Sequence, residues 1–169
     1  MIIAVDVYYE EQRARAAGVI FEHWEDPRPL DVIISYTENP QEYEPGAFYK
    51  RELPCILELL KLTDISGIHT IVVDGYVYLN DEQKPGLGHY VYSHFSEDIP
   101  IIGVAKTAFH NNESVVQKVY RGNSAKPLYI TSAGMSPAAA AENIQSMHGE
   151  YRFPHLLRLL DKHTKESLL

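Results

Sequence analysis

The segment TIVVDGYVYL, residues 70–79, constrains the fold more than any other part of the sequence. It begins with a continuous run of β-branched apolar residues, which indicates a strand that is covered on both faces. A strand of this kind needs helices or other elements packed against both sides of its sheet. The segment therefore predicts an α/β protein with a buried strand over residues 70–79.

Apolar and β-branched segments predict the other strands, and apolar residues at helical spacing predict the helices. The expected strands span residues 2–9, 14–24, 31–36, 99–105 and 127–133. The expected helices span residues 50–62, 136–147 and the segment after Pro154, while residues 88–95 form either a short helix or an extended segment. This order predicts a mixed sheet, a three-strand meander followed by crossover strands, with helices on both faces. We expect residues 1–169 to form one domain.

Charge and composition restrict the partners of the chain. A net charge of -8 disfavours a general nucleic-acid coat, which needs a basic surface, although carboxylates that bind cations also contribute to such a charge. The densest basic run, residues 118–126, is either a phosphate-tracking segment or a solvated loop, and we favour the loop. No apolar run approaches the roughly 20 residues that span a bilayer. The start lacks a basic signal-peptide region, and Cys55 is the single cysteine, so we expect a cytoplasmic protein.

Three acidic residues are candidates for a metal site. Asp6 interrupts an apolar strand pattern, Asp74 ends the run TIVVD, and Glu52 stands at the start of a predicted helix. Buried carboxylates are costly without a partner, and oxygen ligands suit hard cations such as Mg²⁺. Taken singly, Asp74 is typical of a turn residue before Gly75 and Glu52 of an acid favoured by the helix dipole. Asp6 alone is either a hydrogen-bonded edge carboxylate or a site residue. Their combination favours the metal site if the first and fourth strands are neighbours.

Several motifs, in this order along the chain, resemble those of the endonuclease V family. They are VDVYY, YEPGAFYKRELP, VVDG and PIIGVAK, and the later segment GEYRFPHLLRLLDK resembles that family's closing segment. The resemblance runs from about Ile2 to Lys162. It implies a ribonuclease-H-like fold with adjacent first and fourth strands, and Asp6, Glu52 and Asp74 as acids that bind Mg²⁺, with Mn²⁺ as an alternative metal.

The resemblance also implies a reaction and the residues that bind its substrate. The reaction is hydrolysis of a phosphodiester on the 3′ side of inosine in DNA or RNA, with the base turned out of the stack. Tyr43 matches a wedge tyrosine, Pro45 and Gly46 shape the wedge loop, and Lys106 matches the lysine near the reacting phosphate. On their own, Lys106 is typical of a surface lysine and Tyr43 of a loop aromatic.

The chain departs from the family pattern at two positions where the family carries histidine. Asn80 follows VDG where one histidine is expected, and Met135 stands in TSAGMSP where another is expected. Methionine is a poor ligand for a hard cation. The sequence therefore leaves two alternatives beside a nuclease: a catalytically weak or inactive relative that binds nucleic acid, and a metal-dependent hydrolase of the same fold with a changed substrate. It does not indicate an oligomeric state.

Overall fold

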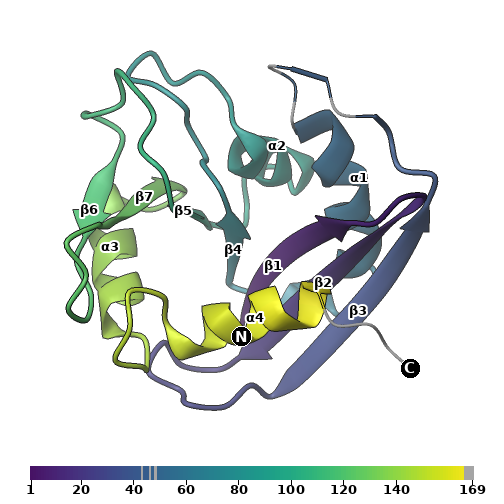
Figure 1. Cartoon of the computed structure of the whole chain (residues 1–169), viewed down its shortest axis with the longest axis horizontal. Helices are drawn as coiled ribbons and strands as arrows, with labels where there is room; N and C mark the ends of the chain where they lie inside the picture. Colours follow the sequence, from purple (N-terminus) through teal and green to yellow (C-terminus); the bar gives the residue numbers. More distant parts are fainter. Residues whose placement is uncertain (43, 46, 48, 166–169) are drawn as a thin grey trace.

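A computed structural model describes residues 1–42, 44–45, 47 and 49–165. Its strands form an open sheet in the order β3-β2-β1-β4-β5-β7-β6 (Figure 1). The strands are β1 (Ile2–Tyr9), β2 (Arg13–Phe21), β3 (Asp31–Glu38), β4 (Thr70–Asp74), β5 (Ile101–Ala105), β6 (Gln117–Val119) and β7 (Leu128–Ala133). β1, β2 and β3 form an antiparallel meander, β4 and β5 run parallel to β1, and β7 and β6 are again antiparallel to their neighbours. The predicted mixed sheet is confirmed, with β1 and β4 adjacent.

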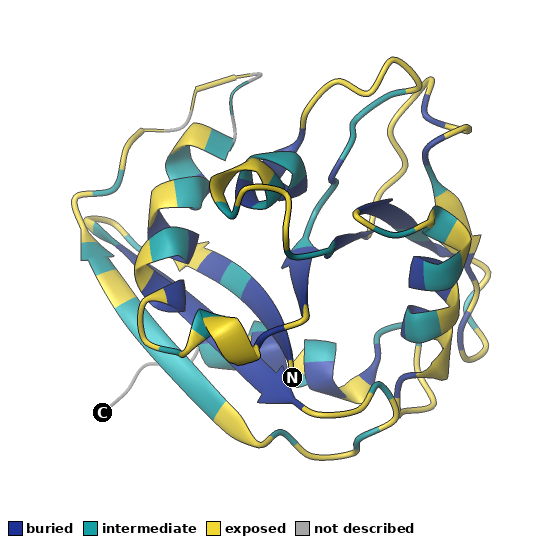
Figure 2. Ribbon diagram, turned by 180° about the vertical axis from the view of Figure 1, so that it is seen from behind, coloured by how far each residue is buried: buried dark blue, intermediate teal, exposed yellow. Residues whose placement is uncertain are grey.

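Two pairs of helices cover opposite faces of this sheet, as Figures 1 and 2 show from opposite sides. Helices α1 (Tyr49–Leu60) and α2 (Leu87–His94) pack on one face, and α3 (Pro137–Ser146) and α4 (His155–Lys165) pack on the other. A short 3₁₀ turn, Ile65–Gly67, leads into β4. Residues 88–95, which the sequence left open, are therefore mostly helical.

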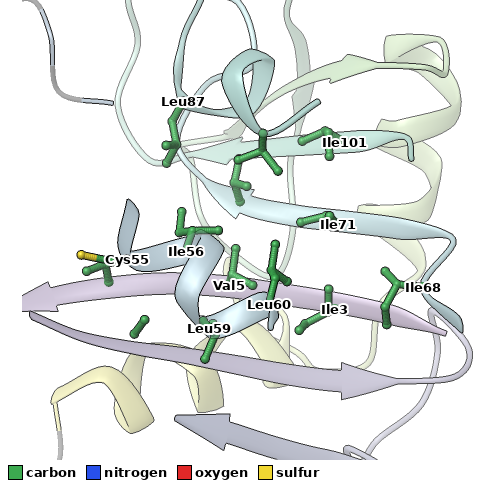
Figure 3. Close-up of a cluster of buried hydrophobic side chains, with 14 of the residues drawn as sticks. Ile3, Val5, Cys55, Ile56, Leu59, Leu60, Ile68, Ile71, Leu87 and Ile101 are labelled. Carbon is green, nitrogen blue, oxygen red and sulfur yellow. The ribbon is translucent and has the colours of Figure 1, made fainter. Parts of the chain in front are cut away.

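The core on the α1 face explains why α1 forms where it does. The apolar side chains of α1 recur at helical spacing, and Ile56 and Leu59 belong to the same buried cluster as Ile3, Val5 and Ile71 of the sheet (Figure 3). All five side chains are at most 1% exposed. Burial of each contributes roughly 1.5–3 kcal/mol, so this contact fixes α1, and with it Glu52, against the sheet.

The core on the opposite face positions α4. Leu156 and Leu160 of α4 are buried together with Ala4 of β1 and Val72 of β4. Arg158, on the other side of the helix, is exposed. This amphipathic pattern lays α4 across β1 and β2, so that it lies beside the strand that carries Asp6.

β4 is shorter than the sequence predicted, because the strand ends at Asp74 and not at Leu79. Gly75 has a φ of +128°, and after it the chain turns away to let the Val77 N–H donate to Thr131 Oγ1 at 2.8 Å. A side chain at Gly103 would block this path, since a Cβ there would lie 2.6 Å from the Gly75 carbonyl oxygen. The predicted strand is confirmed over Thr70–Asp74 and was wrong over residues 75–79, so Asp74 is the last residue of β4.

Two other segments also differ from their predictions. The second strand ends at Phe21 and not at residue 24, because Asp26 accepts hydrogen bonds from the N–H groups of Glu22 and His23 in a turn. The basic run 118–126 contributes to β6, and its Arg121 is 4% exposed. The guanidinium of Arg121 donates to several main-chain carbonyls before α4, so the expected solvated loop was wrong for this part of the run.

Candidate functional site

Asp6 and Asp74 lie side by side on adjacent parallel strands. The register pairs Val5 with Val73, so that the two aspartates follow one position later on β1 and β4. The Val7 N–H donates to Asp6 Oδ1 at 2.8 Å, and the charge of Asp74 acts on the Asp6 carboxyl. The sheet therefore brings together the two acids that lie 68 positions apart in the sequence.

Glu52 enters the same region from the first turn of α1. Its side chain is 6% exposed. The neighbouring Arg51 stacks on the ring of Tyr9 at the end of β1, with Cζ 3.5 Å from the ring centroid. The stack and the buried face of α1 hold Glu52 toward the ends of β1 and β4.

The pKa values of the three acids are all raised, and burial is the largest cause for each. Burial and the negative charge of Asp74 raise the pKa of Asp6 to about 7. Burial, followed by the charges of Asp6 and Asp74, raises the pKa of Glu52 to about 8. Burial also raises the pKa of Asp74, which the charge of Lys106 opposes. Perturbations of this kind are typical of functional sites.

Lys106 follows the last residue of β5 and is held by the segment that precedes α4. Its Nζ lies 5.1 Å from the centroid of the Phe153 ring. Its carbonyl oxygen accepts a hydrogen bond from Arg152 Nη2 at 2.6 Å, and the same nitrogen donates to the Pro127 carbonyl at 2.7 Å. The positive charge of Lys106 lowers the pKa of both aspartates, so it opposes the effect of burial on them.

Asp161 of α4 is a further acid at the site, and sequence reasoning missed it. Its charge raises the pKa of Asp6 and of Asp74, and Lys165 pairs with it at 3.0 Å. The pattern HLLRLLDK predicts an amphipathic helix but leaves Asp161 indistinguishable from an ordinary solvent-facing acid. Only the packing of α4 across β1 and β2 brings it to the site.

Two pockets meet at this group of acids. One, of about 580 Å³, lies beside α4 and is here called the α4 pocket. The other, of about 600 Å³, includes Tyr49 and Glu52 and is called the α1 pocket. The residues that line both pockets are Asp6, Asp74, Lys106 and Asp161. These four residues therefore lie at the boundary between the α1 pocket and the α4 pocket.

The remaining predicted residues lie elsewhere or outside the described part of the chain. Pro45 lies in a turn before α1, where the Ala47 N–H donates to the Glu44 carbonyl at 2.9 Å. Tyr43 and Gly46 fall outside the described residues.

The two positions where histidine was expected have other surroundings. The side-chain oxygen of Asn80 accepts hydrogen bonds from the N–H groups of Glu82 and Lys84, which shape a turn. Met135 packs against the core on the α4 face. Neither residue lines the two pockets.

The acids fit a divalent cation through a pair of carboxylates and not through a larger ligand cluster. Among residues 1–42, 44–45, 47 and 49–165, no group of three or more His, Cys, Asp or Glu side chains is arranged to hold a metal ion. The pair Asp6 and Asp74 nevertheless matches what Mg²⁺ commonly takes from a protein, which is one or two carboxylates together with waters. Their donor chemistry fits a hard cation, and the raised pKa values show that their charges lack sufficient compensation.

An open sheet in this order, with acids side by side on its first and fourth strands, defines the ribonuclease-H-like class of proteins. Within that class, the chain belongs to the endonuclease V family, because the family's sequence model, described as Endonuclease V, matches residues 1–125. The resemblance inferred from the motifs is thereby confirmed.

Solved structures of low sequence identity share the fold. An endonuclease V from Ciona intestinalis, in complex with a 24mer DNA containing an inosine followed by a ribo-adenosine, is 16% identical with a TM-score of 0.81, over 97% of this chain and 84% of that chain. Human endonuclease V is 20% identical with a TM-score of 0.76, over 97% and 82% of the two chains. Endonuclease V from Bacillus subtilis is 18% identical with a TM-score of 0.73, over 96% and 77%.

A search of curated protein sequences found no match. Within the described residues, no helix has the length and apolar character needed to cross a membrane.

Proposed function

We propose that the protein is a divalent-cation-dependent endonuclease that hydrolyses a phosphodiester on the 3′ side of inosine in DNA or RNA. The observation that carries this proposal is the half-buried pair Asp6 and Asp74, beside Lys106, at the boundary of two pockets. Two carboxylates held close together repel each other, and a cation that binds both would relieve this repulsion. Family membership supports a nuclease.

In this proposal Asp6 and Asp74 hold Mg²⁺ or Mn²⁺, with Glu52 as the third acid of the site. A bound cation supplies positive charge to the developing oxyanion and lowers the pKa of a water molecule. Lys106 brings an ammonium group to the same place, where it neutralises charge on the pentavalent phosphate. Hydrolysis joins a water oxygen to phosphorus and breaks the bond from phosphorus to the leaving oxygen.

The α1 pocket is the proposed place for the base that is turned out of the stack. Its volume of about 600 Å³ accommodates a nucleobase, and the rings of Tyr49, Tyr76 and Phe109 line it. Aromatic rings stack on bases with a gain of about 1–3 kcal/mol per base. Tyr43, Pro45 and Gly46 precede α1, which forms one wall of this pocket, and we propose that they act as the wedge loop.

The test is cleavage of strands that contain one inosine and of matched strands that contain adenosine, in both DNA and RNA. Each is incubated with Mg²⁺, Mn²⁺ or EDTA and with the wild type, Asp74→Asn or Lys106→Gln. We expect metal-dependent cutting of the inosine strands alone, lost in Asp74→Asn and reduced in Lys106→Gln. Asp98→Asn, an exposed acid outside both pockets, is the matched control and should cut as the wild type does. Cutting that persists in EDTA or in Asp74→Asn would refute the proposal.

A second candidate function is binding of nucleic acid without cleavage. Asn80 shapes a turn and Met135 packs in the core, so neither supplies the imidazole that the motifs lead one to expect. Tight binding of inosine strands without cutting in any metal would favour this candidate. A metal-dependent hydrolase with a changed substrate would instead bind neither strand while still binding the cation.

A further inference from the structure

A row of basic residues follows one face of α4 and leads away from the acids. His155, Arg158 and Lys162 are separated by three and four positions, and residues at this spacing are neighbours on a helix surface. All three are exposed and line the α4 pocket together with Lys106. His155, at the far end of the row, lies about 9 Å along the helix axis from Asp161. In a chain with a net charge of -8, a row of one arginine, one lysine and one histidine on a single helix face needs a local explanation.

The α4 pocket has the features of a binding site for an extended anion. Its volume of about 580 Å³ falls in the range of ligand pockets. Its floor is apolar, with Val72 and Val104 from the sheet and Leu157 and Leu160 from α4. Asp6, Asp74 and Asp161 line this pocket together with the basic row. A ligand there would therefore meet both the proposed cation site and basic side chains.

Arg158 is the member of the row that is best prepared to bind a phosphate. Its guanidinium stacks on the Tyr151 ring, with Cζ 4.4 Å from the ring centroid. Stacking on a ring restricts the side chain and leaves the N–H groups at the edge of the plane available for a bidentate contact with phosphate. Across the described part of the chain, Arg158 pairs with no carboxylate. Its charge is therefore not used in an internal ion pair.

We propose that the α4 pocket binds the sugar-phosphate backbone of the substrate strand on the 3′ side of the cut, with Arg158 and His155 as the binding residues. This inference rests on the proposed function. If the base occupies the α1 pocket and the scissile phosphate lies at Asp6 and Asp74, the strand beyond the cut continues on the far side of the acids. The α4 pocket is the pocket on that side. Lys106 lines both pockets, so the strand would pass from one pocket to the other beside Lys106.

The test measures how binding depends on strand length in each direction. The Asp74→Asn protein, which should not cut, is titrated by fluorescence anisotropy with labelled single-stranded DNA that contains one inosine. One series has two, five or ten nucleotides after the inosine, and a second series varies the length before it. His155→Gln/Arg158→Gln is compared with His23→Gln/Arg28→Gln, a matched pair of exposed residues outside both pockets. All proteins carry Asp74→Asn, and circular dichroism checks their folding.

We expect 3′ extension to raise the affinity of the parent protein about tenfold, which corresponds to one or two phosphate contacts. The α4 double variant should lose this gain, and the slope of log affinity against log salt should fall by roughly one per lost contact. It should keep the gain from 5′ extension. Arg158→Lys should retain most of the salt slope, and the control pair should behave as the parent does.

Other outcomes separate this inference from the proposed function. If the α4 double variant keeps the 3′ gain and the full salt slope, the inference is wrong, whether or not the wild type cuts inosine strands. Loss of the 5′ gain in place of the 3′ gain would contradict the proposed direction of the strand. If the parent protein binds no strand and the wild type cuts none, the proposed function fails and the inference fails with it.

Discussion

At the scale of single residues, the acids at the ends of β1 and β4 are a source of instability when no cation is bound. The pKa of Asp6 is raised to about 7 and that of Glu52 to about 8. A carboxyl whose folded-state pKa is raised stabilises the fold below its unfolded pKa, near 4. That contribution is lost as the pH rises through the folded-state pKa. Without divalent cations, the stability of the protein should therefore decline between about pH 4 and pH 8.

Asp74→Asn should stabilise the cation-free protein at high pH. At pH 9 the neighbouring acids are ionised and the substitution removes one repelling charge. At pH 5 Asp6 and Glu52 are largely protonated, so little repulsion remains to be removed. We expect the free energy of unfolding in urea with EDTA to rise by roughly 1–3 kcal/mol at pH 9 and to change little at pH 5. Asp98→Asn is the control, and equal effects at both pH values would contradict the electrostatic explanation.

Arg152→Ala should destabilise the protein and loosen Lys106. One nitrogen of Arg152 donates to the carbonyls of Lys106 and Pro127, which ties the end of β5 to the chain just before β7. Loss of hydrogen bonds from a charged group costs about 1.5–3 kcal/mol. The urea midpoint should fall accordingly, and cleavage should fall further than the unfolded fraction explains. Arg28→Ala, at an exposed site, should change neither quantity, and an unchanged midpoint in Arg152→Ala would refute the structural role.

At the scale of secondary structure, the end of β4 decides where Asp74 lies. The apolar run of residues 70–73 predicts the strand, but the continuing pattern GYVYL predicts five more residues that the structure does not place in it. The strand ends early because Gly75, Gly103 and Thr131 come together. These residues are far apart in the sequence, so local patterns could not reveal that their backbones meet.

Gly103→Ala should displace the backbone after Asp74, where it passes close to Gly103 and Thr131. A Cβ at residue 103 would lie 2.6 Å from the Gly75 carbonyl oxygen, 2.7 Å from Thr131 Oγ1 and 2.9 Å from the Val77 nitrogen. Two of these neighbours are main-chain atoms, so the backbone after Asp74 must move. We expect a loss of about 1–3 kcal/mol in the free energy of unfolding, together with weaker cation binding in calorimetry. Gly67→Ala is the control, because its Cβ would meet only the flexible end of Met1 at 3.3 Å. Equal effects of the two substitutions would contradict the role of the close approach between Gly103 and the backbone after Asp74.

The elements also show how much of the site could be predicted. Asp6 and Asp74 stand out because each interrupts or ends an apolar strand pattern, and the adjacent strands predicted for them are confirmed. Glu52 is a first-turn acid by its sequence, and only the packing of α1 directs it inward. Asp161 carries no local signal. Strand positions were thus predictable from periodicity, whereas the helical members of the site depend on packing between distant segments.

At the scale of the whole molecule, the sheet separates two hydrophobic cores, and the candidate site lies where the helices of both faces approach its strand ends. α1 contributes Glu52 from one face and α4 contributes Asp161 from the other. The site therefore requires both cores to be formed. A cation that binds the acids is expected to bind the folded chain far better than the unfolded one, and its binding should stabilise the whole molecule.

Mg²⁺ should consequently raise the free energy of unfolding, by about 2.7 kcal/mol when its concentration is 100 times its dissociation constant. The effect should be larger at pH 8 than at pH 5, because protons compete with the cation for Asp6 and Glu52. Urea unfolding with MgCl₂, or with NaCl of equal ionic strength, separates site binding from general screening of the net charge of -8. Asp98→Asn should keep the Mg²⁺ effect and Asp74→Asn should lose most of it. If NaCl stabilises both variants as much as MgCl₂ does, the acids bind no specific cation, and the repulsion between Asp6 and Asp74 then has no relief in the folded protein other than protonation.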